Sequence, residues 1–109
     1  MVSLVDIQDL ADKIAREFDP EKIILFGSHA GGTPRVDSDV DLLVILPVAG
    51  KNWRKAAEIR SRIQSSFPLD LLVRAPEEVR RRVNEGDPFL REISERGLVL
   101  HARDHARMD

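Results

Sequence analysis

The hydrophobic residues of this chain recur with two periods that alternate along the sequence. Apolar side chains from Ile7 to Phe18 recur every three or four positions, which is the spacing of a helix with one buried side. A similar period runs from Asn52 to Phe67, and Pro76 and Pro88 favour the first turns of two shorter helices. Helices are therefore predicted over residues 3–18, 52–67, 76–84 and 88–96.

Short and almost wholly apolar runs separate these helices. The runs are KIILFG (22–27), DVDLLVIL (39–46), LDLLVRA (69–75) and, near the end of the chain, LVLHA (98–102). Runs of this length next to glycine or proline are typical of buried strands, and the last is expected to be an edge strand. The tail after residue 102 is expected to fray. The alternation predicts one α/β or α+β domain over residues 1–109, with a small sheet flanked by helices.

Composition narrows the class of protein. Of the 109 residues, 42% are hydrophobic and 33% are charged, which is the balance of an ordinary soluble protein with a real core. Seventeen basic and nineteen acidic residues give a net charge of −2, so strong nucleic-acid binding is not expected. A membrane span would need an apolar run of about 18 residues, and none is present. With no cysteine for a disulfide, a cytoplasmic setting is compatible.

Three aspartates open the apolar runs. Asp39 and Asp41 begin the run at 39–46, and Asp70 begins the run at 69–75. Because side chains alternate across a strand, Asp39 and Asp41 should project from one face, about 7 Å apart. Burying a carboxylate without a partner is costly, so the three acids indicate a ligand that balances their charge. Carboxylates that share a site with substrate phosphates are typical magnesium ligands.

A Gly-Ser turn precedes these acids. Gly27 and Ser28 end the first strand, where backbone N–H groups and a hydroxyl can bind an anion. The turn meets the acids if strand 22–27 is antiparallel to strand 39–46 and strand 69–75 is parallel to it. The helix at 52–67 would supply the crossover that a parallel pair requires. The sequence therefore predicts a pair of metal ions carrying a polyphosphate at one end of the sheet.

Other phosphate and metal sites do not fit the sequence. It contains neither the GxxxxGK[ST] motif of a P-loop nor the GxGxxG fingerprint of dinucleotide-binding domains. Asp37, Asp39 and Asp41 resemble the start of a calcium-binding loop. However, Leu42 stands where that loop needs glycine, and Val48 stands where it needs a bidentate glutamate. A calcium loop is therefore excluded.

The stretch GSHAGGTPRVDSDVDLLVIL (27–46) resembles the signature of the minimal nucleotidyltransferases (MNT) of the DNA polymerase β superfamily. Gly-Ser, ten residues and Asp-x-Asp are followed by a third acid in PLDLLV, and the similarity spans roughly residues 5 to 102. The resemblance implies a polymerase β-like fold and transfer of a nucleoside monophosphate, expected to be AMP, from ATP or another nucleoside triphosphate. By position, Gly27 and Ser28 would bind the nucleotide. Asp39, Asp41 and Asp70 would be catalytic and would bind two Mg²⁺ ions.

The resemblance also implies a partner. Members of this class act as antitoxins beside HEPN ribonuclease toxins, some by adding AMP to a toxin tyrosine, so a HEPN-family partner and a homo- or hetero-oligomer are expected. This chain has no tyrosine of its own to modify. It also lacks the basic residues that many relatives carry near His29 and Gly31, where Arg35 is a candidate replacement. An alternative is therefore a weak or inactive module that neutralises the toxin by binding alone.

A small-molecule modifier such as an aminoglycoside adenylyltransferase is not expected, because 109 residues leave no second domain for an acceptor pocket.

Several other residues have expected roles outside the chemistry. Trp53 is expected to anchor the core, and Arg80 to Arg82 to form a solvated, salt-bridged helix face. Asp37 and Ser38 are expected to shape the turn before the second strand. The last two helices offer a candidate surface for a partner.

Overall fold

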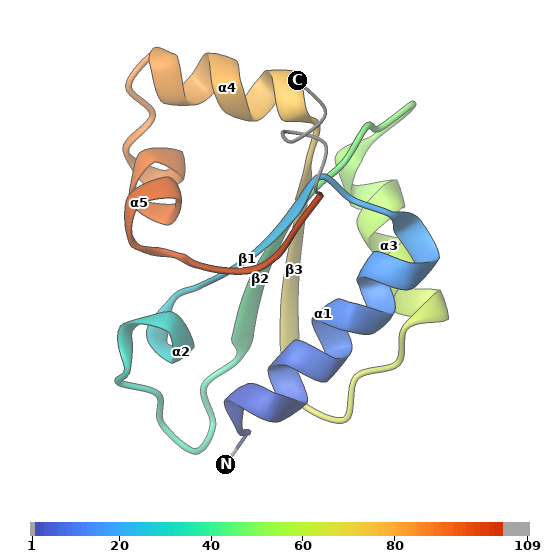
Figure 1. The fold of residues 1–109 in the computed structure, drawn as a ribbon, viewed down its shortest axis with the longest axis vertical. Helices are drawn as coiled ribbons and strands as arrows, with labels where there is room; N and C mark the ends of the chain where they lie inside the picture. The colour runs from blue at the N-terminus through green and yellow to red at the C-terminus, as the bar shows by residue number, and fades with distance from the viewer. Residues whose placement is uncertain (1, 104–109) are drawn as a thin grey trace.

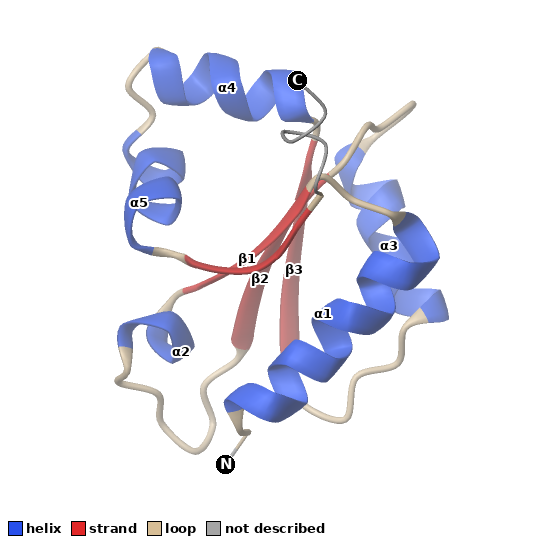
Figure 2. Cartoon of the chain, viewed as in Figure 1, coloured by secondary structure: helices blue, strands red, loops and turns tan. Residues whose placement is uncertain are grey.

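The computed structural model describes residues 2–103, which fold into a mixed sheet with a helical layer on each face. The elements are α1 (Leu4–Phe18), β1 (Lys22–Phe26), α2 (Ser28–Gly31), β2 (Val40–Ile45), α3 (Asn52–Arg62), β3 (Leu69–Arg74), α4 (Pro76–Asn84), α5 (Pro88–Arg96) and β4 (Leu98–Ala102). Helices α1 and α3 cover one face, and α2, α4 and α5 lie on the other (Figures 1 and 2). The expected mixture of helices and strands is confirmed. Residues 104–109 of the tail expected to fray lie outside the described residues.

The strands lie in the order β3-β2-β1-β4. β1 is antiparallel to both β2 and β4, whereas β2 and β3 are parallel. Both pairings required by the sequence argument are therefore present, with α3 as the crossover, and β4 is an edge strand as expected. The C-terminal end of β1 consequently meets the N-terminal ends of β2 and β3 at one end of the sheet.

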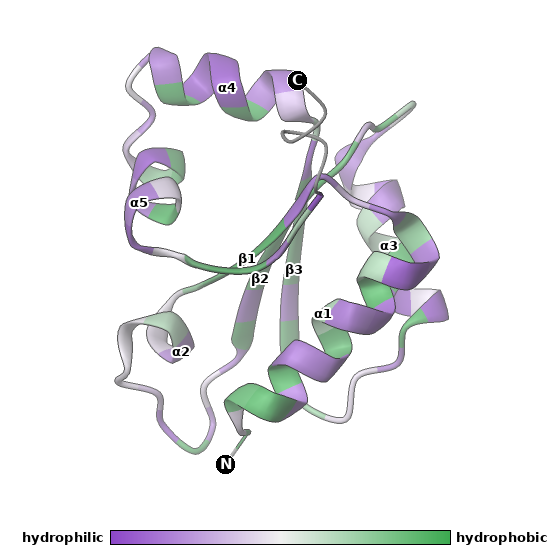
Figure 3. Ribbon diagram, viewed as in Figure 1, coloured by the Kyte–Doolittle hydropathy of each residue, from purple (hydrophilic) through white to green (hydrophobic). Residues whose placement is uncertain are grey.

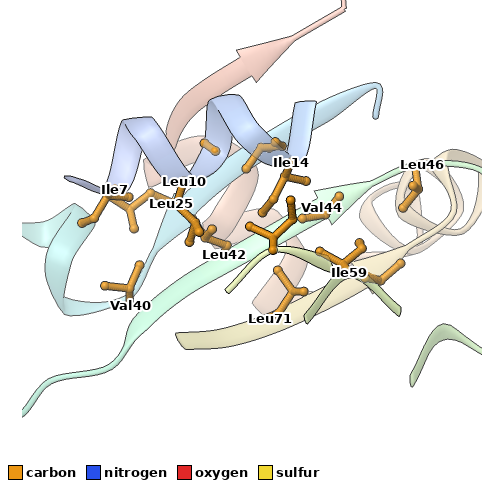
Figure 4. Close-up of a cluster of buried hydrophobic side chains, with 14 residues drawn as sticks. Ile7, Leu10, Ile14, Leu25, Val40, Leu42, Val44, Leu46, Ile59 and Leu71 are labelled. Carbon is orange, nitrogen blue, oxygen red and sulfur yellow. The ribbon is translucent and has the colours of Figure 1, made fainter. Parts of the chain in front are cut away.

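The two faces of the sheet are packed differently. Val40, Leu42 and Val44 of β2 join a cluster of fourteen buried residues with α1 and α3, part of which Figure 4 shows. The alternate residues Leu43 and Ile45 belong to a cluster of five that includes side chains of α5. Because β2 and β3 are in parallel register, Asp41 and Asp70 lie on the face of this smaller cluster.

Helix α1 has a defined cap at each end and the one buried side that its apolar period predicts. Its N-terminus carries a capping box, in which the Ser3 hydroxyl accepts from the Asp6 N–H and the Asp6 carboxylate accepts from the Ser3 N–H. Its C-cap, Asp19, is left-handed with φ +47°, which turns the chain towards β1. Hydrophobic and hydrophilic residues alternate along the helix (Figure 3), and the buried ones are Ile7, Leu10, Ala11 and Ile14.

Helix α3 is shorter than predicted. It ends at Arg62, five residues before Phe67. The Ser65 hydroxyl donates to the Phe67 carbonyl at 2.6 Å and accepts from the Phe67 N–H at 3.1 Å, a local turn that competes with helix hydrogen bonds. Pro68 also disfavours helical geometry at the residue before it.

The expectation that Trp53 anchors the core is wrong. Its side chain is 65% exposed, and the Arg54 guanidinium lies 5.3 Å from the centre of a ring. Ile59, which is the buried residue of α3, stands about 120° around the helix from Trp53. Trp53 therefore belongs to the outer side of α3, where it is available to solvent.

Arg80 and Arg82 of α4 form salt bridges, as expected of the run Arg80 to Arg82. Arg82 contacts Glu78 at 3.2 Å and Asp87 at 2.7 Å, and Arg80 lies 3.9 Å from Glu21 and from Glu77. Asp87 also caps α5 by accepting from the Leu90 N–H, and this bond together with Arg82 lowers the pKa of Asp87. These contacts fix the junction between α4 and α5. None of the helices in residues 2–103 has both the length and the apolar character needed to cross a bilayer.

Candidate active site

Strand pairing brings the predicted site residues to one end of the sheet. Asp41 and Asp70 are directly paired positions of β2 and β3, and Asp39 stands just before β2. On its other side Asp41 is paired with Phe26, the last residue of β1, so Gly27 follows beside it. Register alone thus places Asp70 on one side of Asp41 and Gly27 on the other, and Asp39 lies two residues before Asp41 in the chain.

Gly27 is in close contact with one of the acids. Its backbone has φ +76° and ψ −157°, a region that is essentially restricted to glycine. A Cβ atom built at this position would overlap Oδ2 of Asp41. The sequence argument assigned Gly27 to the approach of a phosphate, and it missed that this glycine also makes room for the Asp41 carboxylate.

The negative charges of Asp70 and Asp39 both act on the Asp41 carboxyl. Partial burial, followed by the negative charges of Asp70 and Asp39, raises the pKa of the half-buried Asp41 carboxyl, while His29 acts in the opposite direction. Asp70 is also within hydrogen-bonding reach of Asp41. Asp39 and Asp70 themselves are exposed. The arrangement concentrates negative charge where only one of the three groups is substantially shielded from water.

The turn after β1 contains a short helix that the sequence did not predict. Ser28 to Gly31 form α2, and Gly32 closes it in the left-handed conformation. The His29 ring lies with Nε2 3.3 Å from the Ser38 carbonyl, which connects α2 to the loop before β2. In that loop the Ser38 hydroxyl accepts from the Arg35 N–H at 2.8 Å, in agreement with a turn-shaping role for Ser38.

The donor set has the right chemistry for a hard divalent cation. Mg²⁺ takes oxygen ligands and is commonly held by one or two carboxylates together with substrate phosphates. Asp41 and Asp70 already lie together, and Asp39 is exposed beside them. Within residues 2–103, however, no three acidic or histidine side chains form a preformed metal centre. Of the three predicted ligands, the structure pairs two closely, and the Asp39 side chain would have to turn towards them.

A family model for the nucleotidyltransferase domain matches residues 7–101 of the chain. No curated protein sequence matches it significantly. The matched segment contains the Gly-Ser turn and all three acids. It also contains every strand apart from the last residue of β4.

Solved structures share the fold at low sequence identity. A proposed nucleotidyltransferase from Sulfolobus solfataricus is 20% identical with a TM-score of 0.66, covering 93% of this chain and 81% of that one. A toxin–antitoxin complex with AMP-PNP is 21% identical with a TM-score of 0.51, covering 93% and 77%. A tri-AMPylated HEPN toxin with its MNT antitoxin, from Shewanella oneidensis, gives 17% identity and a TM-score of 0.51, covering 95% and 76%. The expected nucleotidyltransferase fold is therefore confirmed.

Proposed function

Because the chain belongs to the nucleotidyltransferase domain family, we propose that it transfers AMP from ATP to a hydroxyl group of a HEPN-type toxin and acts as the antitoxin. The supporting observation is the register that places Asp70 beside Asp41 and Gly27 on its other flank. A structure of the same fold, in which an MNT antitoxin is bound to an AMPylated HEPN toxin, supports the choice of nucleotide and partner.

The proposed reaction is an in-line displacement at the α-phosphorus of ATP. The acceptor oxygen forms a bond to this phosphorus while the bond to the bridging oxygen of the β-phosphate breaks, and pyrophosphate leaves with the electron pair. Asp70 receives the proton of the acceptor hydroxyl. Asp39, Asp41 and Asp70 would hold the two Mg²⁺ ions, which when bound stabilise charge on the attacking and leaving oxygens. The Gly27 backbone and the Ser28 hydroxyl contact the triphosphate.

Label transfer tests this proposal directly. The protein is mixed with Mg²⁺, a candidate HEPN toxin and ATP labelled at the α-phosphate, and the toxin should become labelled. ATP labelled at the γ-phosphate should leave the toxin unlabelled, because only the nucleoside monophosphate is transferred. Asp41→Asn should abolish labelling, whereas Asp37→Asn, which removes an exposed charge from the same loop, should not. A toxin that remains unlabelled with α-labelled ATP contradicts the proposed activity.

A second candidate function is neutralisation by binding alone. It is favoured by the lack of lysine and arginine from His29 to Gly31 and by the separation of Asp39 from the other two acids. The double variant Asp39→Asn and Asp41→Asn separates the two functions in a toxin-neutralisation assay. Unchanged neutralisation by this variant favours binding, and lost neutralisation with retained toxin binding favours catalysis.

A further inference from the structure

A cavity of about 460 Å³ lies between the Gly-Ser turn and α5. Phe26, Gly27 and Ser28 line one side of it, and Phe89, Glu92 and Arg96 of α5 line the other. Its volume is within the range of about 300–1,000 Å³ that small-molecule sites occupy. Because Gly27 and Ser28 are also the proposed triphosphate contacts, the cavity continues the candidate active site.

The cavity and the acids share one face of the sheet. Phe26 packs with the smaller buried cluster, to which Ile93 of α5 belongs, and Asp41 lies on the same face. The Asp41 carboxylate occupies the position that a Cβ atom of residue 27 would take, and Gly27 itself lines the cavity. Gly27 therefore lies between the Asp41 carboxylate and the cavity.

Arg96 is the basic side chain in the lining of this cavity. It stands in the last turn of α5, is exposed, and makes no ion pair with any other residue of the range 2–103. The Gly-Ser turn itself carries no lysine or arginine from residue 27 to residue 34. The remaining lining is largely apolar apart from the Glu92 carboxylate.

Close packing holds the end of α5 against β1. The rings of Phe26 and Phe89 meet edge to face, with centroids 5.6 Å apart and planes at 88°. At the other end of the helix, a Cβ atom on Gly97 would come within 2.5 Å of the Ile24 side chain and of the Ile93 carbonyl oxygen. The backbone next to Arg96 is thus fixed on β1, which places the guanidinium on a rigid support.

We infer that this cavity binds the terminal phosphates of the nucleoside triphosphate and that Arg96 supplies the positive charge missing from the Gly-Ser turn. The inference rests on the proposed function, because it assigns one end of the same substrate. When the α-phosphorus is attacked, the electron pair of the broken bond goes to the leaving pyrophosphate. Arg96 then stabilises that negative charge by charge-assisted hydrogen bonds.

Binding of inorganic tripolyphosphate tests the inference without requiring turnover. Its dissociation constant is measured by calorimetry in the presence of Mg²⁺ for the wild type, Arg96→Gln and Arg91→Gln. Arg91 is an exposed arginine of the same helix that does not line the cavity, so the two variants carry the same change of charge. Arg96→Gln should weaken binding about tenfold or more, the effect of losing hydrogen bonds between charged groups. Arg91→Gln should stay within about twofold. Glu92→Gln should tighten binding, because it removes a carboxylate from the same lining.

Adenosine, which carries no phosphate, is the second probe, and its dissociation constant is measured in the same way. Thermal melting verifies that each variant is folded. Equal tripolyphosphate affinities for Arg96→Gln and Arg91→Gln overturn the inference. A variant Arg96→Gln that weakens adenosine binding but not tripolyphosphate binding also overturns it, because the cavity would then hold the nucleoside. If wild-type protein transfers no label but its tripolyphosphate binding depends on Arg96, the proposed function fails and the phosphate site stands. If label is transferred but tripolyphosphate binding does not depend on Arg96, the proposed function stands and the inferred phosphate site fails.

Discussion

The two faces of the sheet use the same strands for different purposes. On the face covered by α1 and α3, Val40, Leu42 and Val44 are buried in a cluster of fourteen residues. On the opposite face, Leu43 and Ile45 belong to a cluster of five residues. The half-buried Asp41 lies on this same face of β2, two residues before Leu43. The thickly packed face supplies most of the hydrophobic stabilisation, and the thinly packed face leaves room for charged side chains.

Stability and chemistry are therefore separated on the two faces of a single sheet. Alternation along β2 sends each residue to the face opposite its neighbour, so Asp41 and Leu42 are adjacent in sequence and differ in role. A change on the thickly packed face should therefore alter stability first. A change at the acids should alter activity first and leave folding intact or improved.

The largest expected effect is on catalysis at Asp41. Asp41→Asn keeps the shape of the side chain but removes its charge, so the rate of nucleotide transfer should fall by about 10³-fold or more, equivalent to about 4 kcal/mol. Its urea midpoint should equal or exceed that of the wild type. A variant that loses activity by unfolding would show that the two faces are not separate in function.

The next largest effect is on stability at Leu42. Leu42→Ala removes a fully buried side chain from the larger cluster and should cost about 3 kcal/mol of unfolding free energy. The matched change Leu72→Ala, at a half-buried position on the other face, should cost about 1 kcal/mol. Urea denaturation followed by circular dichroism measures both. Equal losses would contradict the contrast between the faces.

An intermediate effect is expected where the Gly-Ser turn meets the acids. Gly27→Ala places a methyl group on the Asp41 carboxylate in a backbone region that alanine avoids, and should cost about 1–3 kcal/mol. Gly31→Ala is the control for stability, because no atom lies within 4 Å of the added methyl group. Thermal melting compares the two. If Gly27→Ala is as stable as Gly31→Ala, the carboxylate is not held over the turn.

The smallest effect is a pH dependence of stability in metal-free protein. The pKa of Asp41 is raised in the folded state, so folding favours its protonated form. Its contribution to stability is therefore present at low pH and lost as the pH rises through the raised pKa. After allowance for screening by water, the loss should reach at most about 1 kcal/mol.

Two comparisons in the same experiment identify this effect. Asp41→Asn should lack the corresponding part of the pH profile, and its melting temperature at neutral pH should be the higher one. Added Mg²⁺ should raise the melting temperature of the wild type, because a ligand that binds the folded state stabilises it. Identical pH profiles with and without the Asp41 carboxyl would refute the electrostatic coupling.

Local signals in the sequence were sufficient for most of the elements and for the pairing of Asp41 with Asp70. Hydrophobic periods predicted α1 and all four strands, and the requirement that Asp39, Asp41 and Asp70 meet Gly27 predicted the pairing of β1, β2 and β3. The roles assigned to these residues stay predictions. What the sequence did not reveal depends on distant neighbours or on competing local bonds.

Trp53, Ser65 and Arg96 illustrate these limits. Whether a tryptophan is buried depends on which side of α3 meets the sheet, and Trp53 lies about 120° from Ile59. Ser65 ends the helical region because its hydroxyl bonds to Phe67, an interaction that the apolar period does not encode. Arg96 lines the same cavity as the Gly-Ser turn only because α5 folds onto β1, which brings together residues almost seventy positions apart.

The parallel register of β2 and β3 determines both the packing of the core and the pairing of Asp41 with Asp70. Sliding β3 past β2 by a single residue would exchange the faces of Leu71 and Leu72 and would point Asp70 at α1 and α3. Insertions in the loops that flank α3 leave this alignment untouched, whereas one deletion inside LDLLVR destroys the hydrophobic interior and the acid pair together. A molecule in which β3 is paired out of register with β2 would accordingly be inactive. Recovery of activity during refolding would therefore report that the two strands have reached their native register.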